Sequence, residues 1–366
     1  MSFLKCKPTV YVIGNEYEIA VHAHKNGIIF VKVGGESYYT ANNGCLSSEK
    51  SFAKIRVPQK ALDSAKKYEI VFRETINRKS YFSEMGDAQT AEFEFKPIEK
   101  TDNINIYHIA DVHYLYDVAK CNASYFGEEC DLFVVNGDIG EVESEQNYYE
   151  TSEFVGEISG GKIPVLFVRG NHDTRGKLAE KYGEYFPVQG AATYFTFEIG
   201  CIGGVALDCG EDKFDSNEAY NGTNIFEKYR REELKWLKGV KLPKKKYTLA
   251  VSHICPAWTS EKEGNLFDIE RELYKEMTDE LNRLKTNLML CGHLHKIYVL
   301  EPNDTRSFQK HNFHIVIGSQ LDNMNYKNRT IDRLYGTAVT LCGNEAKVSF
   351  TDQNKEVLES RVLKIK

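Results

Sequence analysis

Hydrophobic and polar positions divide this chain into two regions of different character. From Pro8 to about Lys96, short runs rich in valine, isoleucine, tyrosine and phenylalanine are separated by turn-forming residues, and no helical period is evident. These runs are TVYVIG, EYEIAVHAH, GIIFVKV, ESYYT, FAKIRV, KYEIVF and AEFEFK. Short strands at this spacing predict an all-β sandwich of immunoglobulin or fibronectin type over residues 1–98. His22 and His24 alternate within one run, which favours a solvated strand face over a metal site.

The pattern changes after a charged, proline-containing segment, Lys96–Asn103, which we interpret as a linker. Apolar runs now alternate with segments whose apolar residues recur at three- and four-residue spacing. These segments are SEQNYYETSEFVGEIS, FEKYRREELKWLKGV and DIERELYKEMTDELNRL. The alternation predicts an α/β domain over residues 103–366, in which Trp236 and Leu237 lie on a core-facing helical stripe.

Composition and charge narrow the class of protein. The chain has 366 residues, more than one hydrophobic core usually needs, and a formal net charge of -6. That charge disfavours a nucleic acid or an anionic membrane as a partner. No apolar stretch is long enough to span a bilayer and the first residues lack a signal-peptide pattern, so we predict a cytoplasmic protein. Nine scattered cysteines without a C-x-x-C pair fit reduced thiols.

Polar side chains follow five apolar runs of the second region, at the point where each predicted strand ends. The runs INIYHIA, DLFVVNG, KIPVLFVRG, YTLAVS and NLMLCG lead in turn into Asp111 and His113, Asp138 and Glu141, Asn171 to Asp173, His253, and His293 and His295. In open α/β sheets, ligands bind outside the carboxyl ends of the strands. Each residue alone has a structural explanation, such as a turn cap or a hydrogen-bonded core histidine. Together they are more informative, because five of the ten histidines fall at these strand ends. Glycines precede three of the clusters, as expected where the backbone turns sharply beside a ligand.

The order of these blocks, D-x-H, G-D-x-x-E, G-N-H-D, H and G-H-x-H, resembles the calcineurin-like metallophosphoesterase superfamily. The resemblance covers about two thirds of the chain, from Asn103 onwards. It implies a four-layer αββα sandwich with a two-metal site at one edge, here preceded by the all-β sandwich.

The resemblance also implies a role for each matching residue. Asp111, His113 and His295 would hold one metal, Asn171, His253 and His293 the second, and Asp138 would bridge both. Mixed nitrogen and oxygen ligands suit manganese, iron or zinc, whereas Cys255 and Cys291 are predicted to pack within strands. Two metals about 3.5–4 Å apart activate a bridging hydroxide for attack on phosphorus. His172 matches the family's non-ligand catalytic histidine, and Glu141 is the candidate carboxylate that orients it. For Asp173 we weigh a supporting role near the site against a helix cap and favour the cap.

Two departures separate the chain from named branches of the superfamily. Val142-Glu143 stands where protein serine/threonine phosphatases carry an arginine and glycine. Purple acid phosphatases share an N-terminal β-sandwich but place an iron-binding tyrosine three residues after the bridging aspartate, where this chain has Glu141. A tyrosinate-bound iron is therefore not expected.

Substrate choice is expected in the loops between blocks. The segments CPAWTSEKEGNLF and GSQLDNMNYKNRT follow apparent strands, and Trp258 and Tyr326 within them could stack on a base or sugar or simply pack against their own loops. Asn171, His172 and Arg175 are further candidate substrate contacts, although for Arg169 and Arg175 ordinary surface roles are the alternative.

Three hypotheses about function remain open on the sequence alone. The first is a phosphomonoesterase for a small or medium-sized phosphorylated compound. The second is a phosphodiesterase that cleaves a cyclic nucleotide, a phospholipid headgroup or a nucleic acid with the same metals. The third is a non-catalytic metal-binding scaffold, which a full set of ligands disfavours. The N-terminal domain could shape the rim of the site, mediate dimerisation or bind a protein partner.

Overall fold

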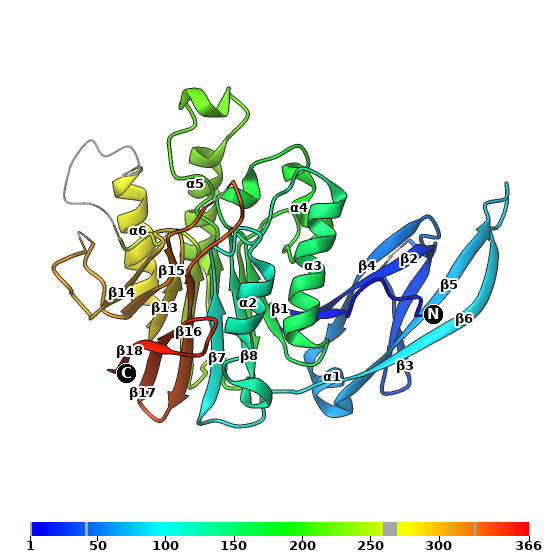
Figure 1. Cartoon of the computed structure of the whole chain (residues 1–366), viewed down its shortest axis with the longest axis horizontal. Helices are drawn as coiled ribbons and strands as arrows, with labels where there is room; N and C mark the ends of the chain where they lie inside the picture. The colour runs from blue at the N-terminus through cyan, green and yellow to red at the C-terminus, as the bar shows by residue number, and fades with distance from the viewer. Residues whose placement is uncertain (1, 41–42, 259–268, 308, 326, 366) are drawn as a thin grey trace.

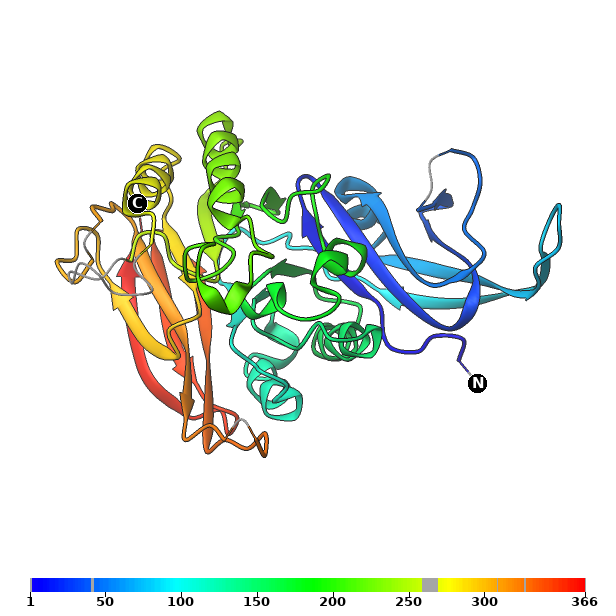
Figure 2. The ribbon, with the colours of Figure 1, turned by 90° about the horizontal axis from the view of Figure 1, so that it is seen from above.

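The structure, a computed structural model, describes residues 2–40, 43–258, 269–307, 309–325 and 327–365. Two β-sheets lie face to face between two layers of helices, and the N-terminal strands extend from one side of this body (Figures 1 and 2). The first sheet includes, in this order, β18 (Val357–Lys364), β17 (Glu345–Thr351), β16 (Arg333–Cys342), β7 (Ile104–Ile109), β8 (Leu132–Asn136), β9 (Val165–Val168) and β1 (Thr9–Ile13), and it continues from β1 into the N-terminal strands. Within it β7, β8, β9 and β1 are parallel.

The second sheet is also parallel at its centre. Its strands follow in the order β10 (Phe195–Ile199), β11 (Ile202–Leu207), β12 (Tyr247–Ser252), β13 (Leu288–Cys291), β15 (His314–Asp322) and β14 (Lys296–Leu300). The outer strands β10 and β14 are antiparallel to their neighbours. Parallel strands covered on both faces read as continuous apolar runs, and β8, β12 and β13 are almost entirely buried.

Helices cover the outer faces of both sheets, which completes the predicted αββα order of layers. Figure 2 shows α2 (Tyr116–Ala123) and α3 (Glu145–Ser159) on one side, and α5 (Phe226–Gly239) and α6 (Arg271–Arg283) on the other. The three predicted helical segments are confirmed as α3, α5 and α6. Leu237 is fully buried and Trp236 packs against the same cluster, as the stripe predicts.

In the N-terminal region β2 (Glu16–Val33) is the longest strand and pairs with four others. Its first half pairs with β1 and β4 (Lys50–Pro58), and its second half pairs with β3 (Glu36–Tyr38) and β5 (Lys67–Asn77), which is followed by β6 (Glu84–Glu94). The runs EYEIAVHAH and GIIFVKV, predicted as two strands, are therefore one strand whose pairing shifts between His22 and Gly27. The short helix α1 (Gln59–Ala65) was not predicted, because it buries only Leu62 and shows no period.

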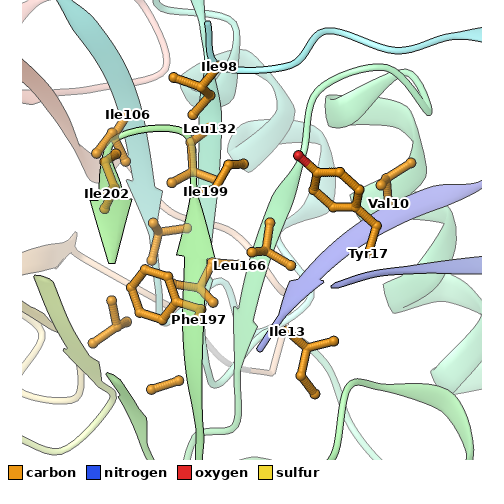
Figure 3. Packing of buried hydrophobic residues seen from close by; sticks show 14 of the residues in the cluster. Val10, Ile13, Tyr17, Ile98, Ile106, Leu132, Leu166, Phe197, Ile199 and Ile202 are labelled. Atoms are coloured by element: carbon orange, nitrogen blue, oxygen red, sulfur yellow. The ribbon is translucent and has the colours of Figure 1, made fainter. Parts of the chain in front are cut away.

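The N-terminal strands share a core with the rest of the protein. Strand β1 pairs with β2 on one side and with β9 on the other, where Tyr11 faces Val165. Figure 3 shows Val10 and Tyr17 in the same buried cluster as Leu166 and Phe197. The predicted boundary between residues 1–98 and 103–366 follows the change in composition. The sheet that contains β1 and the buried cluster that contains Val10 and Tyr17 both include residues from the two sides of that boundary.

The side chain of His22 is buried, although the sequence predicted a solvated position. Its side chain is only 7% exposed, and its ring lies 4.2 Å from that of Phe52, between ring centroids, with Tyr149 and Tyr185 close by. The expectation of a solvated strand face is therefore wrong for His22, because α3 and α4 (Tyr182–Tyr185) cover this part of β2.

Two further expectations concern the whole chain. All nine cysteines are free, as predicted. Cys291 is buried at the end of β13 (Leu288–Cys291), as expected, whereas Cys255 is buried after β12 and outside any strand. Among the described residues, no helix combines the length and the apolar character needed to cross a membrane.

Candidate metal centre

The carboxyl ends of five parallel strands meet at one edge of the two sheets. Asp111 and His113 follow β7, Asp138 follows β8, Asn171 and His172 follow β9, His253 follows β12, and His293 and His295 follow β13. Because β7, β8 and β9 run in one direction, as β12 and β13 do in the facing sheet, all these side chains reach a common site. The structure thus brings together all seven residues that were predicted as metal ligands.

Three of these side chains form a compact group. Nε2 of His295 lies 3.2 Å from Oδ1 of Asp111 and 3.1 Å from Nε2 of His113. One potential ligand atom from each of the three residues lies within 4.8 Å of the other two. This spacing suits a cation held between one carboxylate and two imidazoles.

Asp138 lies between this group and the remaining ligands. Its Oδ2 is 3.1 Å from Nε2 of His253, which is itself 3.6 Å from Oδ1 of Asp111. The other ring nitrogen of His253, Nδ1, donates a hydrogen bond of 2.6 Å to the carbonyl oxygen of Asn136. That bond fixes the orientation of the ring and directs Nε2 towards the two carboxylates.

Asn171 and His293 complete the set. Oδ1 of Asn171 lies 3.0 Å from Nδ1 of His293, and the backbone amide of His293 donates a 2.8 Å hydrogen bond to Oδ2 of Asp111. The loop after β13 is therefore tied directly to the carboxylate after β7, although 182 residues separate them.

The backbone at the ligands is strained. Five of the seven have φ angles in the left-handed region, which non-glycine residues rarely adopt. They are Asp111 (54°), His113 (44°), Asp138 (55°), His293 (70°) and His295 (51°). Such strain gathers at functional sites, where the surrounding structure must hold it. Here the left-handed conformation lets the chain turn directly after a strand, so that neighbouring ligands such as His293 and His295 both face the site.

Gly170 and Gly292 are required by close approach. A Cβ atom at Gly170 would lie 2.2 Å from Oδ1 of Asp138, and one at Gly292 would lie 2.8 Å from Oδ2 of Asp111. No side chain fits at either position without moving a ligand. Glycines therefore stand beside the ligands, as expected. At Gly170 and Gly292 the reason is that a side chain would collide with a ligand.

Two buried ligand atoms indicate that the site suits a cation. Within the described part of the chain, Oδ1 of Asp111 and Nε2 of His253 make no hydrogen bond of good geometry, and the polar atoms beside them, Nε2 of His295 (3.2 Å) and Oδ2 of Asp138 (3.1 Å), belong to other predicted ligands. Buried polar atoms without a partner are costly, and these two lie 3.6 Å apart. Two divalent ions, one coordinated by Asp111 and the other by His253, would satisfy them, so the residues fit the metals that the resemblance implies.

The charges around the site agree with this interpretation. Burial opposes protonation of His253, but Asp138 and Asp111 raise its pKa to about 10, so in the absence of a metal the site takes up a proton instead. Burial lowers the pKa of His113 and of His293 to about 4. Both imidazoles are therefore neutral at pH 7, the form that binds metal.

Further residues hold the ligands in place. The hydroxyl of Ser319, at the end of the run HIVIGS, donates a hydrogen bond to Oδ2 of Asp111. The carboxylate of Asp173 accepts hydrogen bonds from the backbone amides of Gly170 (2.7 Å) and Asp138 (3.0 Å). Asp173 thus supports the site, and the favoured alternative of a helix cap is wrong. Ser319 was not predicted as a supporting residue, although it follows an apolar run as the ligands do.

His172 stands at the open side of the ligand group. Its side chain is 45% exposed and its Nε2 lies 4.0 Å from Oδ2 of Asp138, while its backbone amide donates a 2.8 Å hydrogen bond to Oδ1 of that residue. Its ring is within hydrogen-bonding distance of Arg175, with Nη1 3.1 Å from Nε2. Glu141 is exposed, and among the described contacts the ring of His172 meets Arg175 rather than Glu141. The orienting role of Glu141 stays a prediction.

Arg175 is held by an acidic residue that sequence reasoning missed. Glu211 accepts hydrogen bonds from Nε and Nη2 of Arg175, each 2.7 Å long, and its side chain is 1% exposed. Arg169 is similarly paired with Asp208, at 2.8 Å from Nε and 2.7 Å from Nη2. Both acids follow the apolar run IGGVAL, a further strand end whose polar residues could have been read like the others.

The two aromatic candidates for substrate contact have different outcomes. Trp258 stacks on Tyr298 with ring centroids 5.4 Å apart, which fits the alternative of packing. Tyr326 lies outside the described residues, as do residues 259–267 of the other candidate loop.

Comparisons with known proteins agree with this geometry. The sequence profile of a family described as "Calcineurin-like phosphoesterase" matches residues 104–297. Among solved structures, the purple acid phosphatase PPD1 from yellow lupin (Lupinus luteus) seeds is similar with a TM-score of 0.62 and 11% identity, over 98% of this chain and 74% of that one. A structure of PhoD is similar with a TM-score of 0.55 and 11% identity, over 98% and 92% of the two chains. No curated protein matches significantly in sequence.

Proposed function

This chain belongs to the calcineurin-like phosphoesterase family, and we propose that within it the protein is a metal-dependent phosphomonoesterase for small or medium-sized substrates. Membership makes the protein a phosphoester hydrolase whose family uses a site for two divalent metal ions. What we propose beyond this is the preference for monoesters and the role of each residue in the site.

The seven converging side chains would hold the two cations. Asp111, His113 and His295 would bind one ion, Asn171, His253 and His293 the other, and Asp138 both, with manganese, iron or zinc suited to these donors. When bound, such a pair supplies positive charge to the phosphoryl oxygens and lowers the pKa of water. Oδ1 of Asp111 and Nε2 of His253, which are buried, lie 3.6 Å apart and have predicted ligands as their polar neighbours, support this use of the site.

His172 is the proposed acid of the reaction. A ring nitrogen of His172 lies within 4.8 Å of potential ligand atoms of His113 and Asp138, and its exposure leaves the ring accessible to a substrate. Burial, together with nearby Arg175, lowers its pKa in the free protein, and a bound phosphate would offset this by favouring the charged ring. His172 would then contact the phosphoryl group and give a proton to the departing oxygen, a contribution of about 10²–10⁴-fold.

The position of Arg175 is the observation that favours monoesters. Glu211 holds two nitrogens of its guanidinium, and the third, Nη1, points to the ring of His172. A planar guanidinium there can share a phosphoryl oxygen with His172. Because Glu211 neutralises its charge, Arg175 acts here as a hydrogen-bond donor through Nη1. A monoester has one more terminal phosphoryl oxygen than a diester, so it offers this donor and His172 one more acceptor.

The proposal is tested by the hydrolysis of an aryl phosphate monoester and the matching diester after reconstitution with manganese, zinc or iron. We expect metal-dependent turnover with faster hydrolysis of the monoester. Asn171→Ala should abolish it, whereas Asn26→Ala, an exposed asparagine of β2, should not change it. Diester hydrolysis at an equal or higher rate would contradict the monoesterase. Bound metal without turnover of either ester would contradict the generic phosphatase, and protein that binds no metal would favour the scaffold hypothesis.

A further inference from the structure

A cavity of about 670 Å³ lies beside the proposed metal centre, and apart from Arg175 and Glu211 the residues that line it have no part in the function described so far. Its walls come from the segment between β11 and α5, from the start of α5, and from the 3-10 helix Ala179–Lys181. In Figure 1 the segment before α5 rises at the upper edge of the view, the edge at which β7 and β8 end. The volume is within the range of small-molecule binding sites and exceeds what a phosphoryl group needs.

Arg175 connects this cavity to the site of chemistry. Arg175, Thr174 and Glu211 line the cavity, and Nη1 of Arg175 lies 3.1 Å from Nε2 of His172. His172 in turn approaches Asp138 to 4.0 Å. A group attached to a phosphoryl oxygen at His172 would therefore pass Arg175 and enter the cavity.

Aromatic and apolar side chains form much of the cavity wall. Phe226 and Tyr229 meet edge to face with ring centroids 6.1 Å apart, and the hydroxyl of Tyr229 accepts a hydrogen bond from the backbone amide of Thr193, so the half-buried ring is the part of Tyr229 offered to the cavity. Ile225 is 69% exposed at the wall. Tyr220 is also part of the wall, and its hydroxyl donates to Glu211. Such a surface gains most from covering by a flat apolar ring.

The charges of the cavity argue against a second anionic group in the ligand. Its two guanidinium groups are already paired, Arg169 with Asp208 and Arg175 with Glu211. Glu180 is a further acidic residue of the wall. No cationic excess is left for a second phosphate or a carboxylate, and an additional anion would meet acidic groups.

We propose that this cavity receives the leaving group and selects phosphate esters of uncharged, ring-bearing alcohols over those of short aliphatic or polyanionic alcohols. The inference rests on the proposed hydrolysis of phosphate esters and specifies its class of substrate. Phe226, Tyr229 and Ile225 would contact the ring, and Arg175 would mark the boundary between ring and phosphate.

Two variants and one control test this inference with 2-naphthyl phosphate and ethyl phosphate. Ala219 is exposed on the cavity wall, so Ala219→Trp should fill the cavity without disturbing the core. Ile225→Ala removes an apolar contact. Ile76→Ala changes an isoleucine that is 56% exposed on β5, outside the cavity, and serves as the matched control.

We expect Ala219→Trp to lower kcat/KM for 2-naphthyl phosphate about 10-fold, and Ile225→Ala about 3-fold, while the values for ethyl phosphate stay within about 2-fold. Ile76→Ala should change neither. Equal losses for both esters, or no loss for the naphthyl ester, would overturn the inference. If Ala219→Trp does not fold, Ile225→Ala decides by the same criterion.

A binding measurement separates this inference from the proposed function. Calorimetry with metal-free protein should show about 10-fold tighter binding of 2-naphthyl phosphate than of ethyl phosphate, and Ala219→Trp should remove the difference. If neither ester is hydrolysed but this difference is found, the phosphatase proposal fails and the cavity assignment stands. If both esters are hydrolysed and bind equally well, the cavity assignment fails alone.

Discussion

Glu211 accepts two hydrogen bonds from Arg175, with Oε1 2.7 Å from Nε and Oε2 2.7 Å from Nη2. The carboxylate is almost fully buried and also accepts hydrogen bonds from the hydroxyls of Thr174 (3.1 Å) and Tyr220 (3.1 Å). Only Nη1 of Arg175 remains directed at His172. An acid that follows β11 thereby sets the position of a cation beside the metal centre.

Glu211→Gln should weaken substrate binding. The amide keeps the size of the side chain but offers only one acceptor and no charge, so the two-pronged bond to Arg175 is lost. We expect kcat/KM for an aryl phosphate monoester to fall about 10-fold, mainly through KM, because a bond of this kind contributes about 1.5–3 kcal/mol. Glu218→Gln, at an exposed position nearby, is the control. An unchanged KM would contradict the role of Arg175 in phosphate binding.

Ser319→Ala should weaken metal binding. The Ser319 hydroxyl donates to Oδ2 of Asp111 in the buried site, and residues that support metal ligands typically contribute about 10–100-fold to affinity. We expect a loss of at least about 10-fold in calorimetric titration with manganese or zinc. Ser349→Ala removes a buried serine that pairs with Ser360 at 2.8 Å, and it should not alter metal affinity. Equal affinities of the two variants would show that Asp111 does not depend on Ser319.

Gly170→Ala should destroy the site, because the new methyl group would lie 2.2 Å from Oδ1 of Asp138. We expect substoichiometric metal in elemental analysis of the purified variant. Gly160→Ala is the matched control: Gly160 ends α3 with φ of 66°, and a Cβ there meets nothing within 4 Å. That substitution should cost about 1 kcal/mol of stability through backbone strain and leave the metal content unchanged. Full metal content in Gly170→Ala would contradict a close approach of Gly170 to the bridging carboxylate.

Removal of metal should lower the melting temperature. A ligand that binds only the folded state stabilises it by about 2.7 kcal/mol when present at 100 times its dissociation constant. Thermal unfolding with added metal and with a chelator measures the effect. Asn171→Ala should show a smaller difference between the two conditions than the unaltered protein, since Asn171 is one of the proposed ligands. A difference of the same size would remove Asn171 from the ligand set.

His22 should make the metal-free protein sensitive to acid. Burial, with a smaller effect of Lys5, lowers the pKa of His22 to about 3, below its ordinary value of about 6.5. The unfolded chain therefore takes up this proton first. The stabilising contribution of neutral His22 is fully present above pH 6.5 and is lost as the pH falls towards 3, at about 1.4 kcal/mol per pH unit.

Denaturant unfolding between pH 7 and pH 4 measures this slope. His22→Phe, which removes the titrating group from an aromatic environment, should give a shallower dependence than the unaltered protein. His24→Phe, at an exposed position of the same strand, should leave the slope unchanged. If all three proteins lose stability in parallel, another group is responsible.

The sequence by itself determined an α/β domain and the members of the candidate site, and its resemblance to the superfamily implied the four layers. Apolar runs, helical spacing and the polar residues after each run are local signals, and parallel strands must bring their carboxyl ends to one edge. For that reason the ligands from Asp111 to His295 could be grouped before their distances were known, and the helices α3, α5 and α6 could be placed.

Only the tertiary structure decided which side chains support that group. Ser319 and Asp111 are 208 residues apart, and Arg175 and Glu211 are 36 apart, so no local pattern relates them. The same holds for His22: its strand alternates as a solvated strand does, but residues of α3 and α4 pack against its ring. It also holds for β1, whose second edge pairs with β9. Hydrogen-bond partners and burial depend on which elements pack together, and that is a property of the whole fold rather than of any segment.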